Sequence, residues 1–374
     1  MTIRKKYFKT LSGKRLPLPL FFPDATRGVI KTLDSADIEN TKTPGILVNT
    51  YHLYYQLGRR VIKNHKGIGS FMSWNGGTIS DSGGFQVMSL IKRGVVKGVI
   101  EDRGIVFKNT GKKKEIFSPE DSIKFQLELK TDLAVVLDDF TPPSADFDKA
   151  KETVERTILW AKKSKDEFEK LCRQRGLKKK DRPYLVAVVQ GGKHLVLRKD
   201  CAQRLAEIGF DGYGFGGWPI KDDGRFDYDS AKVIADNTPK NSFLYGLGIG
   251  KPEEIVTCTK LGYQIFDCVL PTRDARHKRL YIFDADSIES IDINLPAGRQ
   301  ANTKFYSFYT PDKEKYYADR GPVSKACDCL LCSRYSRAYL AHLFRINEMT
   351  AGRLATIHNL RFYSILMEKI REQG

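Results

Sequence analysis

The chain has 374 residues, 41% of them hydrophobic, and its 63 Lys and Arg against 45 Asp and Glu give a formal net charge of +18. It has no run of about 18 apolar residues, so we expect no transmembrane helix, and the basic N-terminal segment 1–10 lacks the apolar stretch of a secretory signal. A positive excess this large favours a polyanionic partner such as a nucleic acid.

Eight apolar runs alternate with helical patterns, and each run ends in small or polar residues. In chain order they cover residues 17–26, 45–53, 77–86, 132–142, 184–192, 210–217, 243–250 and 263–270. Continuous apolar strands separated by helices are typical of a parallel sheet that is buried on both faces. Eight such units predict an α/β protein with a (β/α)8 barrel whose site lies at the carboxyl ends of the strands. A doubly wound open sheet is the alternative.

Two segments interrupt this alternation. Residues 92–118 have the pattern of a basic hairpin around Asp102, Arg103 and Gly104, followed by a turn-like stretch at residues 112–114. Residues 281–332 lack strong helical periodicity and contain a polar loop with Gly and Pro at residues 293–302. From Ser333 to the end the pattern is helical.

Two strand ends carry side chains suited to a displacement reaction. Asp267 lies in the last apolar run and is followed by Arg273 and Arg276, a combination that suits a negatively charged substrate. Asp81 precedes paired glycines and Phe85, which places a carboxylate beside adaptable backbone and a flat ring. One carboxylate can attack an anomeric carbon while the other transfers protons, and the sequence alone does not assign the roles. The alternative is that both acids only cap turns.

Two further strand ends could recognise a heterocyclic base. Asp138 accepts N–H bonds, whereas Gln190 both donates and accepts, so the pair could read the edge of a purine-like ring. Gly217 and Gly248 have no side chains and could admit the rim of such a ligand. Both polar side chains could instead be strand-end caps.

Seven cysteines are present, and three of them form a C-x-C-x2-C cluster at Cys327, Cys329 and Cys332. Three thiolates at this spacing can share one tetrahedral cation, for which zinc is the default. A structural site also needs a downstream histidine, His342 or His358, and a buried thiol cluster without metal is the alternative. This cysteine usage indicates a reduced, cytoplasmic chain with one metal site.

A set of short motifs occurs in a fixed order over about residues 12–370. They are NTYHL (49–53), DSGGFQVMSL (81–90), SPE (118–120), LDDFTP (137–142), VQGG (189–192), FDGYGFGG (210–217), GIGKPEE (248–254), FDCVLPTR (266–273), the cysteine cluster, and SRAYL with HN (336–340 and 358–359). With this set the chain resembles the bacterial-type tRNA-guanine transglycosylases, the queuine tRNA-ribosyltransferase family. The resemblance implies an irregular (β/α)8 barrel at residues 12–280, an inserted zinc-binding subdomain at 281–360 and a C-terminal helix at 361–374 that packs back on the barrel.

The resemblance also implies an activity. The protein would be a pentosyltransferase that exchanges the anticodon wobble guanine of tRNA for a 7-deazaguanine, 7-aminomethyl-7-deazaguanine or queuine, in queuosine modification. The target base would leave its stack, and exchange would proceed by ping-pong displacement through a covalent ribosyl-enzyme intermediate. We expect one structural Zn2+, a homodimer in the cytoplasm and no membrane contact. A non-catalytic zinc-bearing tRNA-binding paralogue is the alternative.

Site roles follow from the resemblance residue by residue. Asp267 would be the nucleophile and Asp81 the general acid or base. The substrate base would contact Asp81, Ser82, Gly83, Gly84, Phe85, Asp138, Gln190, Gly217, Leu247 and Gly248. RNA around the wobble base would contact Gly248, Ile249, Gly250, Lys251, Pro252, Glu253, Glu254, Thr272, Arg273, Asp274, Ala275 and Arg276. The metal ligands would be Cys327, Cys329, Cys332 and His358, which leaves His342 as an ordinary helix residue.

Three features depart from the family pattern. Trp218 and Pro219 stand where a small aliphatic pair is usual, Phe140 where a smaller residue is usual, and residues 295–302 look like an insertion. Because Pro219 has no N–H, the Trp218–Pro219 peptide can offer only a carbonyl acceptor, which favours the aminomethyl base or queuine over the cyano base. Bulk at Ile220 and Phe140 favours the aminomethyl base over queuine, and the alternative is that Trp218 forms a stacking wall for the cyclopentenediol ring of queuine.

Overall fold

The computed structural model describes residues 5–92, 94, 97–108, 115–294 and 305–373. Within these ranges one sheet of eight parallel strands has the order β3-β13-β12-β11-β10-β9-β5-β4. The strands are β3 (Leu20–Pro23), β4 (Gly45–Asn49), β5 (Gly77–Asp81), β9 (Leu133–Val135), β10 (Tyr184–Val189), β11 (Gly212–Phe215), β12 (Phe243–Gly246) and β13 (Ile265–Cys268). A parallel bridge between Asp24 and Leu47 brings the two edge strands together, so the barrel is nearly closed. The predicted (β/α)8 barrel is confirmed, with one strand in each of the eight apolar runs.

The strands are apolar because side chains on both of their faces are buried. In β3, for example, Phe21 packs in the core outside the barrel, whereas Phe22 packs inside it. A short hairpin, β1 (Tyr7–Lys9) and β2 (Arg15–Pro17), covers the end where the strands begin. Its Phe8 ring lies 5.5 Å from that of Tyr184 and 6.1 Å from that of Phe243. This end is therefore filled by aromatic side chains, and the opposite end remains for a site.

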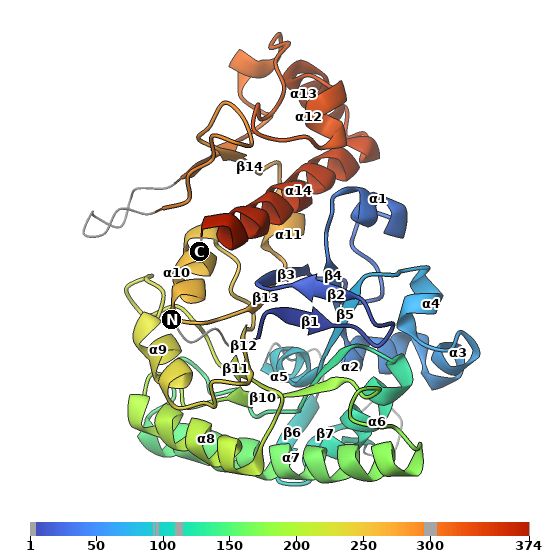
Figure 1. Cartoon of the computed structure of the whole chain (residues 1–374), viewed down its shortest axis with the longest axis vertical. Helices are drawn as coiled ribbons and strands as arrows, with labels where there is room; N and C mark the ends of the chain where they lie inside the picture. Colours follow the sequence, from blue (N-terminus) through green and yellow to red (C-terminus); the bar gives the residue numbers. More distant parts are fainter. Residues whose placement is uncertain (1–4, 93, 95–96, 109–114, 295–304, 374) are drawn as a thin grey trace.

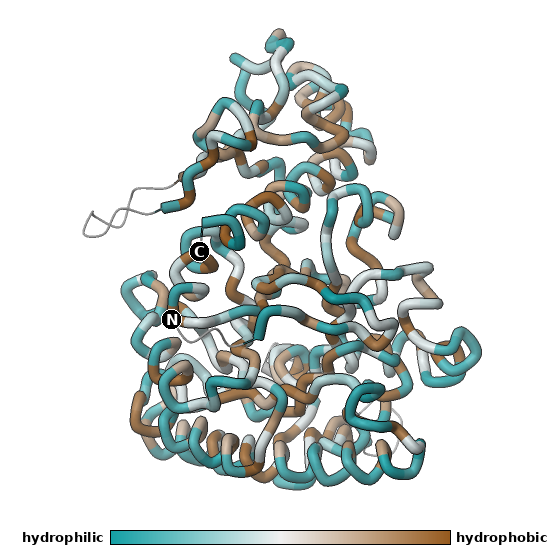
Figure 2. Tube along the Cα trace, in the orientation of Figure 1, coloured by the Kyte–Doolittle hydropathy of each residue, from teal (hydrophilic) through white to brown (hydrophobic). Residues whose placement is uncertain are grey.

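Helices surround the barrel (Figure 1). They are α1 (Ser35–Asn40), α2 (Thr50–His52), the π-helical turn η1 (Leu53–Leu57), α3 (Arg59–Asn64), α4 (Ile68–Met72), α5 (Gly84–Lys92), α6 (Pro119–Leu129), α7 (Phe147–Gln174), α8 (Leu195–Ile208), α9 (Tyr228–Asp236), α10 (Pro252–Lys260) and α11 (Leu270–Arg276). Side-chain caps begin several of them, as where Asp146 accepts from the Lys149 N–H at the start of α7. Figure 2 shows hydrophilic and hydrophobic residues alternating along α7, which buries Val154 and Trp160.

The segment predicted to be a basic hairpin forms a small antiparallel sheet of β6 (Lys97–Glu101), β7 (Gly104–Lys108) and β8 (Glu115–Phe117). The turn at Asp102 and Arg103 is confirmed, whereas the turn expected at residues 112–114 lies outside the described residues. The hairpin packs its apolar side chains, including Phe107, against Trp160 of α7.

The C-terminal part contains the two-stranded sheet of β14 (Leu280–Phe283) and β15 (Tyr306–Tyr309), the turn η2 (Glu314–Tyr316), and helices α12 (Leu330–Arg334), α13 (Arg337–Arg345) and α14 (Met349–Gln373). The helix expected at 361–374 is the second half of α14, since the buried positions Leu354 and Ile357 continue the same apolar pattern upstream. In Figure 1, α14 lies between the barrel and the remainder of this part. The insertion at 295–302 lies outside the described residues. None of the described helices is both long and apolar enough to span a bilayer.

Candidate active site and metal centre

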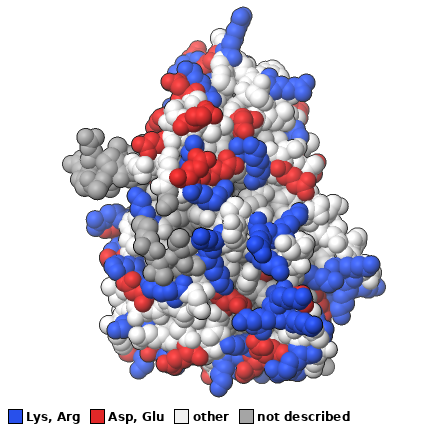
Figure 3. Space-filling model, viewed as in Figure 1, with Lys and Arg blue, Asp and Glu red and all other residues white. Residues whose placement is uncertain are grey.

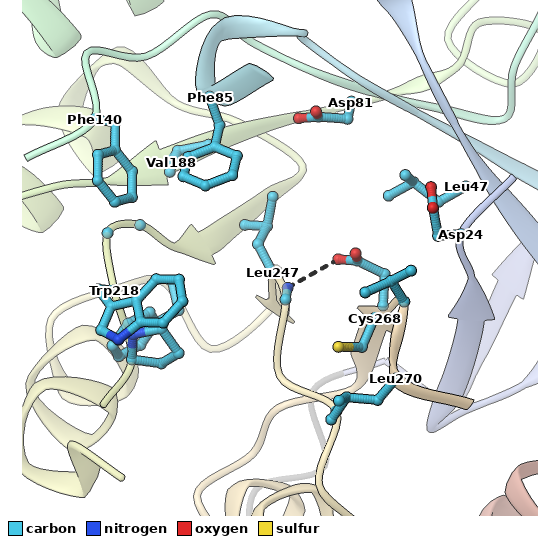
Figure 4. A pocket seen from close by; sticks show the side chains of 18 of the residues that line it. Asp24, Leu47, Asp81, Phe85, Phe140, Val188, Trp218, Leu247, Cys268 and Leu270 are labelled. Atoms are coloured by element: carbon cyan, nitrogen blue, oxygen red, sulfur yellow. Dashed lines mark hydrogen bonds between the residues drawn. The ribbon is translucent and has the colours of Figure 1, made fainter. Parts of the chain in front are cut away.

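A cavity of about 540 Å3 opens where the barrel strands end (Figure 4). Asp81, Asp138, Gln190 and Asp267, predicted from four separate strand ends, all line it. The structure brings these side chains together because parallel strands direct their carboxyl ends to one rim. The cavity is also lined by Asp24, Leu47, Phe85, Phe140, Gly217, Trp218, Pro219, Ile220, Leu247 and Gly248.

Asp267 is held in β13 by two hydrogen-bond donors. Its Oδ1 accepts from the Tyr245 hydroxyl at 2.7 Å and from the Gly248 N–H at 3.2 Å, the bond dashed in Figure 4. Burial raises the pKa of this carboxyl to about 7, and the two donors oppose that rise. The result is a carboxylate with a fixed orientation and enhanced basicity, as a nucleophile requires.

Asp81 lies across the cavity at the end of β5. Its carboxylate accepts from the Asn49 amide at 2.8 Å, because β4 and β5 pair these two residues directly. Burial raises the Asp81 pKa to about 6 against the opposing hydrogen bonds of the Gly83 and Ser82 N–H groups. Gly83 has φ +89, and a Cβ there would lie 2.5 Å from the Tyr51 Cβ, so the loop beyond Asp81 requires glycine.

Asp138 and Gln190 form a second polar pair. The Gln190 Nε2 donates to Asp138 at 2.6 Å, while its Oε1 accepts from the Thr141 N–H at 3.1 Å, so the carboxamide orientation is fixed. Burial raises the pKa of Asp138 to about 7. The pair presents a second N–H of Nε2 beside a carboxyl group, which is a donor and acceptor set for the edge of a planar heterocycle.

A buried guanidinium supports this pair from behind. Arg198 of α8 donates to the carbonyls of Gly192 at 2.7 Å, Val189 at 3.2 Å and Gly216 at 3.0 Å, and it lies over the Phe215 ring. These contacts join the chain after β10 to the chain after β11. Arg198 therefore fixes the spacing of the two loops that carry Gln190 and Gly217.

Aromatic side chains form one wall of the cavity. Phe85 is 43% exposed, and its ring meets that of Phe140 edge to face at 5.0 Å. Trp218 is 54% exposed and lies across from these two rings in Figure 4. Gly217 has φ +85, which turns the chain sharply before Trp218. The two aromatic departures from the family pattern thus lie together beside the polar pair.

Similarity to known proteins shows the family of this chain. A family model described as queuine tRNA-ribosyltransferase matches residues 4–373. The chain belongs to this family. It is 36% identical over 355 residues to the queuine tRNA-ribosyltransferases of Actinobacillus pleuropneumoniae serotype 3 (strain JL03) and serotype 5b (strain L20), and each match covers 95% of this chain and 84% of the relative. The resemblance stated from the motifs is confirmed, and the protein is a pentosyltransferase.

In this enzyme the two segments expected to hold RNA are residues 248–254 and 272–276. Each contains both accessible and buried residues. Exposed or half-buried side chains and backbone occur at Gly248, Lys251, Glu253, Arg273 and Arg276. Buried positions are Ile249, Gly250, Pro252, Glu254, Thr272, Asp274 and Ala275. Of these buried residues, Gly250 and Glu254 line the cavity, whereas Thr272, Asp274 and Ala275 are packed into the protein by α11. Lys251 and Arg273 are the exposed cations of the two segments.

Several residues of the site were not predicted from the sequence. Tyr245 lies inside an apolar strand and resembles a core residue, and Arg198 has the sequence context of a surface helix. Asn49 and Asp24 were recognised as strand ends but were not assigned to the site. Asn49 and Asp24 could have been assigned to the site from their positions, because the carboxyl ends of all eight barrel strands meet at one rim.

The enzyme also contains a group of potential metal ligands. The sulfur atoms of Cys327, Cys329 and Cys332 and a nitrogen of His358 all lie within 4.8 Å of one another. The His358 Nδ1 is 3.2 Å from the Cys332 Sγ and 3.5 Å from the Cys329 Sγ. Three thiolates and one imidazole suit a tetrahedral metal ion. His342, the other candidate, is exposed on α13 and is not part of this group.

Contacts behind the cluster orient its histidine. The Nε2 of His358 lies 2.7 Å from the carbonyl oxygen of Tyr281, so an N–H there donates and leaves Nδ1 free to bind a metal. The next residue, Asn359, accepts from the Tyr281 N–H at 3.1 Å and donates to the Pro271 carbonyl at 2.9 Å. A single turn of α14 thus contacts both the cluster and the segment that follows Asp267.

We expect Cys329→Ser to lower metal content from about one equivalent per chain and to lower the melting temperature, since a tetrahedral site loses a ligand. Metal analysis and calorimetry on the purified protein measure both. His342→Ala is the matched control and should keep its metal and its melting temperature. Metal lost in His342→Ala but kept in His358→Ala would show that the fourth ligand is wrongly assigned.

We expect Asp267→Asn to melt at a higher temperature than the parent protein at pH 8. The folded-state pKa of about 7 lies above the ordinary 3.8, so folding favours the protonated carboxyl and stability falls as pH rises between these values. An amide avoids this loss, which is on the order of 4 kcal/mol above pH 7. The difference should shrink as the pH falls toward about 4.

Calorimetry at several pH values measures this effect. The exposed Asp222→Asn serves as control and should change the melting temperature little at any of them. A lower melting temperature for Asp267→Asn at pH 8 would contradict the expected cost of burying this carboxylate.

Proposed function

We propose that this enzyme exchanges the wobble guanine of tRNA for a 7-deazaguanine through a covalent ribosyl intermediate on Asp267. The observation that carries the proposal is the pair of half-buried carboxylates, Asp81 and Asp267, in one cavity with the Asp138–Gln190 pair. Burial raises the pKa of Asp81 to about 6 and that of Asp267 to about 7, so each acid can change its protonation state near neutral pH. In the proposed exchange the ionised form of Asp267 attacks and the protonated form of Asp81 donates a proton.

In the first half-reaction, an oxygen of Asp267 attacks C1′ of the ribose while the bond from C1′ to N9 of guanine breaks. Tyr245 and Gly248 keep Oδ1 of Asp267 in place during the attack. Asp81 donates its proton to the departing base, which leaves as neutral guanine. In the second half, the incoming base transfers its N9 proton to Asp81, its nitrogen attacks C1′, and the ester bond to Asp267 breaks. Atoms and protons balance over the cycle.

The same pocket would bind both bases in turn. Asp138 accepts from ring and exocyclic N–H groups of a guanine edge, and Gln190 donates to its carbonyl oxygen. The Gly217 backbone lies close to this edge because it has no side chain. Phe85 offers an exposed ring for stacking. The Arg198 contacts with the surrounding carbonyls hold these groups at a constant spacing.

Cations at the cavity rim would bind the phosphates of tRNA. Lys251 and Arg273 are exposed and line the same cavity as Asp267, Arg276 is half-buried at the end of α11, and the net charge of +18 adds a long-range attraction. Figure 3 shows lysine and arginine side chains over much of one face, including the flank where Figure 1 draws α3. We also propose a homodimer in the cytoplasm, in line with the family resemblance.

We propose zinc as the metal of the cysteine cluster, with a structural role. Cys327, Cys329, Cys332 and His358 would fill its four tetrahedral positions and leave none for a substrate. The catalytic barrel at 12–280 and the zinc subdomain from 281 would be separate units joined by α14.

The proposed exchange predicts that Asp267→Asn loses activity but keeps tRNA binding. Labelled guanine should enter whole tRNA with the parent enzyme, and the variant should be slower by at least about 1,000-fold, because an amide is a poor nucleophile. Denaturing gels should show a tRNA adduct for the parent enzyme and none for the variant. Exchange at the parent rate in the variant, or an adduct on it, would eliminate Asp267 as nucleophile.

The identity of the incoming base can be tested at Pro219. The Trp218 carbonyl should accept from the aminomethyl group, whereas a nitrile finds no donor in the Trp218–Pro219 peptide. We expect incorporation in the order aminomethyl base, queuine, cyano base when the three compete for one tRNA. Pro219→Ala restores the N–H and should improve incorporation of the cyano base relative to the other two. Incorporation of the cyano base as fast as the aminomethyl base by the parent enzyme would contradict this argument.

A further inference from the structure

The cavity contains a fourth carboxylate, Asp24, to which the proposed exchange assigns no role. Asp24 directly follows β3, whose Pro23 pairs with Cys268 of β13, so it lies beside the end of the strand that carries Asp267. It is half-buried and faces the cavity together with Leu47 (Figure 4). The charge of Asp24 also acts on Asp267, whose raised pKa has this carboxylate among its smaller causes. Asp24 is therefore near the reacting centre without being one of the reacting acids.

The position of Asp24 indicates which part of the substrate it would meet. In Figure 4 the aromatic rings of Phe85, Phe140 and Trp218 lie on one side of Leu247, and Asp24 lies on the other. Cys268, the neighbour of Asp267 in β13, is on the Asp24 side. A base held between those rings and the Asp138–Gln190 pair directs its N9 toward Asp267. The sugar attached to N9 then extends to the remaining side of the cavity. That side is the wall formed by Asp24 and Leu47.

Asp24 has a free hydrogen-bond acceptor for this sugar. Its Oδ1 accepts from both the N–H, at 3.0 Å, and the hydroxyl of Thr26. Among the described residues, none donates to Oδ2, and no lysine or arginine forms an ion pair with Asp24. Thr26 thus orients the carboxylate, and one charged oxygen remains to accept from a ligand.

The chemistry of a polynucleotide determines which group can donate. Within the chain, the 3′ and 5′ oxygens of each ribose are esterified to phosphate, so the 2′-hydroxyl is the only sugar group with a proton to give. We propose that Asp24 accepts a hydrogen bond from the 2′-hydroxyl of the target nucleotide and so selects RNA over DNA at that position. This inference rests on the proposed exchange reaction and adds a specificity residue to the same site.

Two RNA hairpins with the sequence of a tRNA anticodon arm test the assignment. One carries guanosine at the wobble position, and the other carries 2′-deoxyguanosine at that position only. The measured quantity is kcat/KM for entry of labelled guanine, expressed as the ratio of the ribose to the deoxyribose hairpin. Removal of Asp24 in Asp24→Ala should lower this ratio by about tenfold or more, because a hydrogen bond to a charged acceptor is lost. Asp24→Asn, which keeps an oxygen acceptor without the charge, should give an intermediate ratio.

The deoxyribose hairpin is an internal control for folding and for the effect of the Asp24 charge on Asp267, since both effects change the rates of the two hairpins by the same factor and leave their ratio unaltered. Leu47→Ala is the matched control on the same wall, and it should change both hairpins by the same factor because leucine makes no hydrogen bond. An equal ratio in Asp24→Ala and the parent enzyme, with exchange intact, would overturn the role of Asp24 alone. No exchange in either hairpin by the parent enzyme, which binds them, would overturn the proposed reaction and this inference with it.

Discussion

The hydrogen bonds made by two neighbouring residues of α14 hold the parts of this molecule in register. Asn359 binds the Pro271 and Arg279 carbonyls and the Tyr281 N–H, and so spans the segment that leaves Asp267. His358, beside it, belongs to the cysteine cluster. One turn further along, Tyr363 donates to the Gly250 carbonyl at 2.6 Å. The loops on both sides of Asp267 are therefore fixed from one helix, and that helix is fixed by the cluster.

This fixation keeps three carboxyl groups buried at the mouth of the barrel, which has a cost in stability when they are ionised. Asp81, Asp138 and Asp267 each have a pKa raised by burial, so each carboxylate is less stable there than in water when ionised. A flexible rim would admit water and relieve that cost, and the basicity of the acids would fall with it. Arg198 contributes to the same rigidity, since it joins two loops through their carbonyls and satisfies its own buried charge.

The features that depend on a local pattern of apolar and polar residues could be predicted from the sequence. The eight apolar runs each contain a barrel strand, and Asp81, Asp138, Gln190 and Asp267 meet because they end parallel strands. Prediction from the sequence failed where a role depends on contacts between distant segments. Tyr245 reads as a core residue until its hydroxyl is seen to reach Asp267. The resemblance implied a C-terminal helix at 361–374, whereas α14 begins at Met349, because buried positions such as Leu354 and Ile357 continue its apolar pattern upstream.

The arrangement around α14 also explains how a metal could matter to a reaction that it does not touch. None of the four residues of the cluster lines the cavity, and α14 lies between the barrel and the helices α12 and α13 in Figure 1. The cluster is connected to the segment that follows Asp267 through the backbone of α14, because His358 and Asn359 are consecutive residues. A change in the His358 position would be transmitted to Asn359 and to the Pro271 and Arg279 carbonyls that it holds. Loss of a metal from the cluster would therefore change the position of the chain around Asp267, and the charges of the cavity would stay the same.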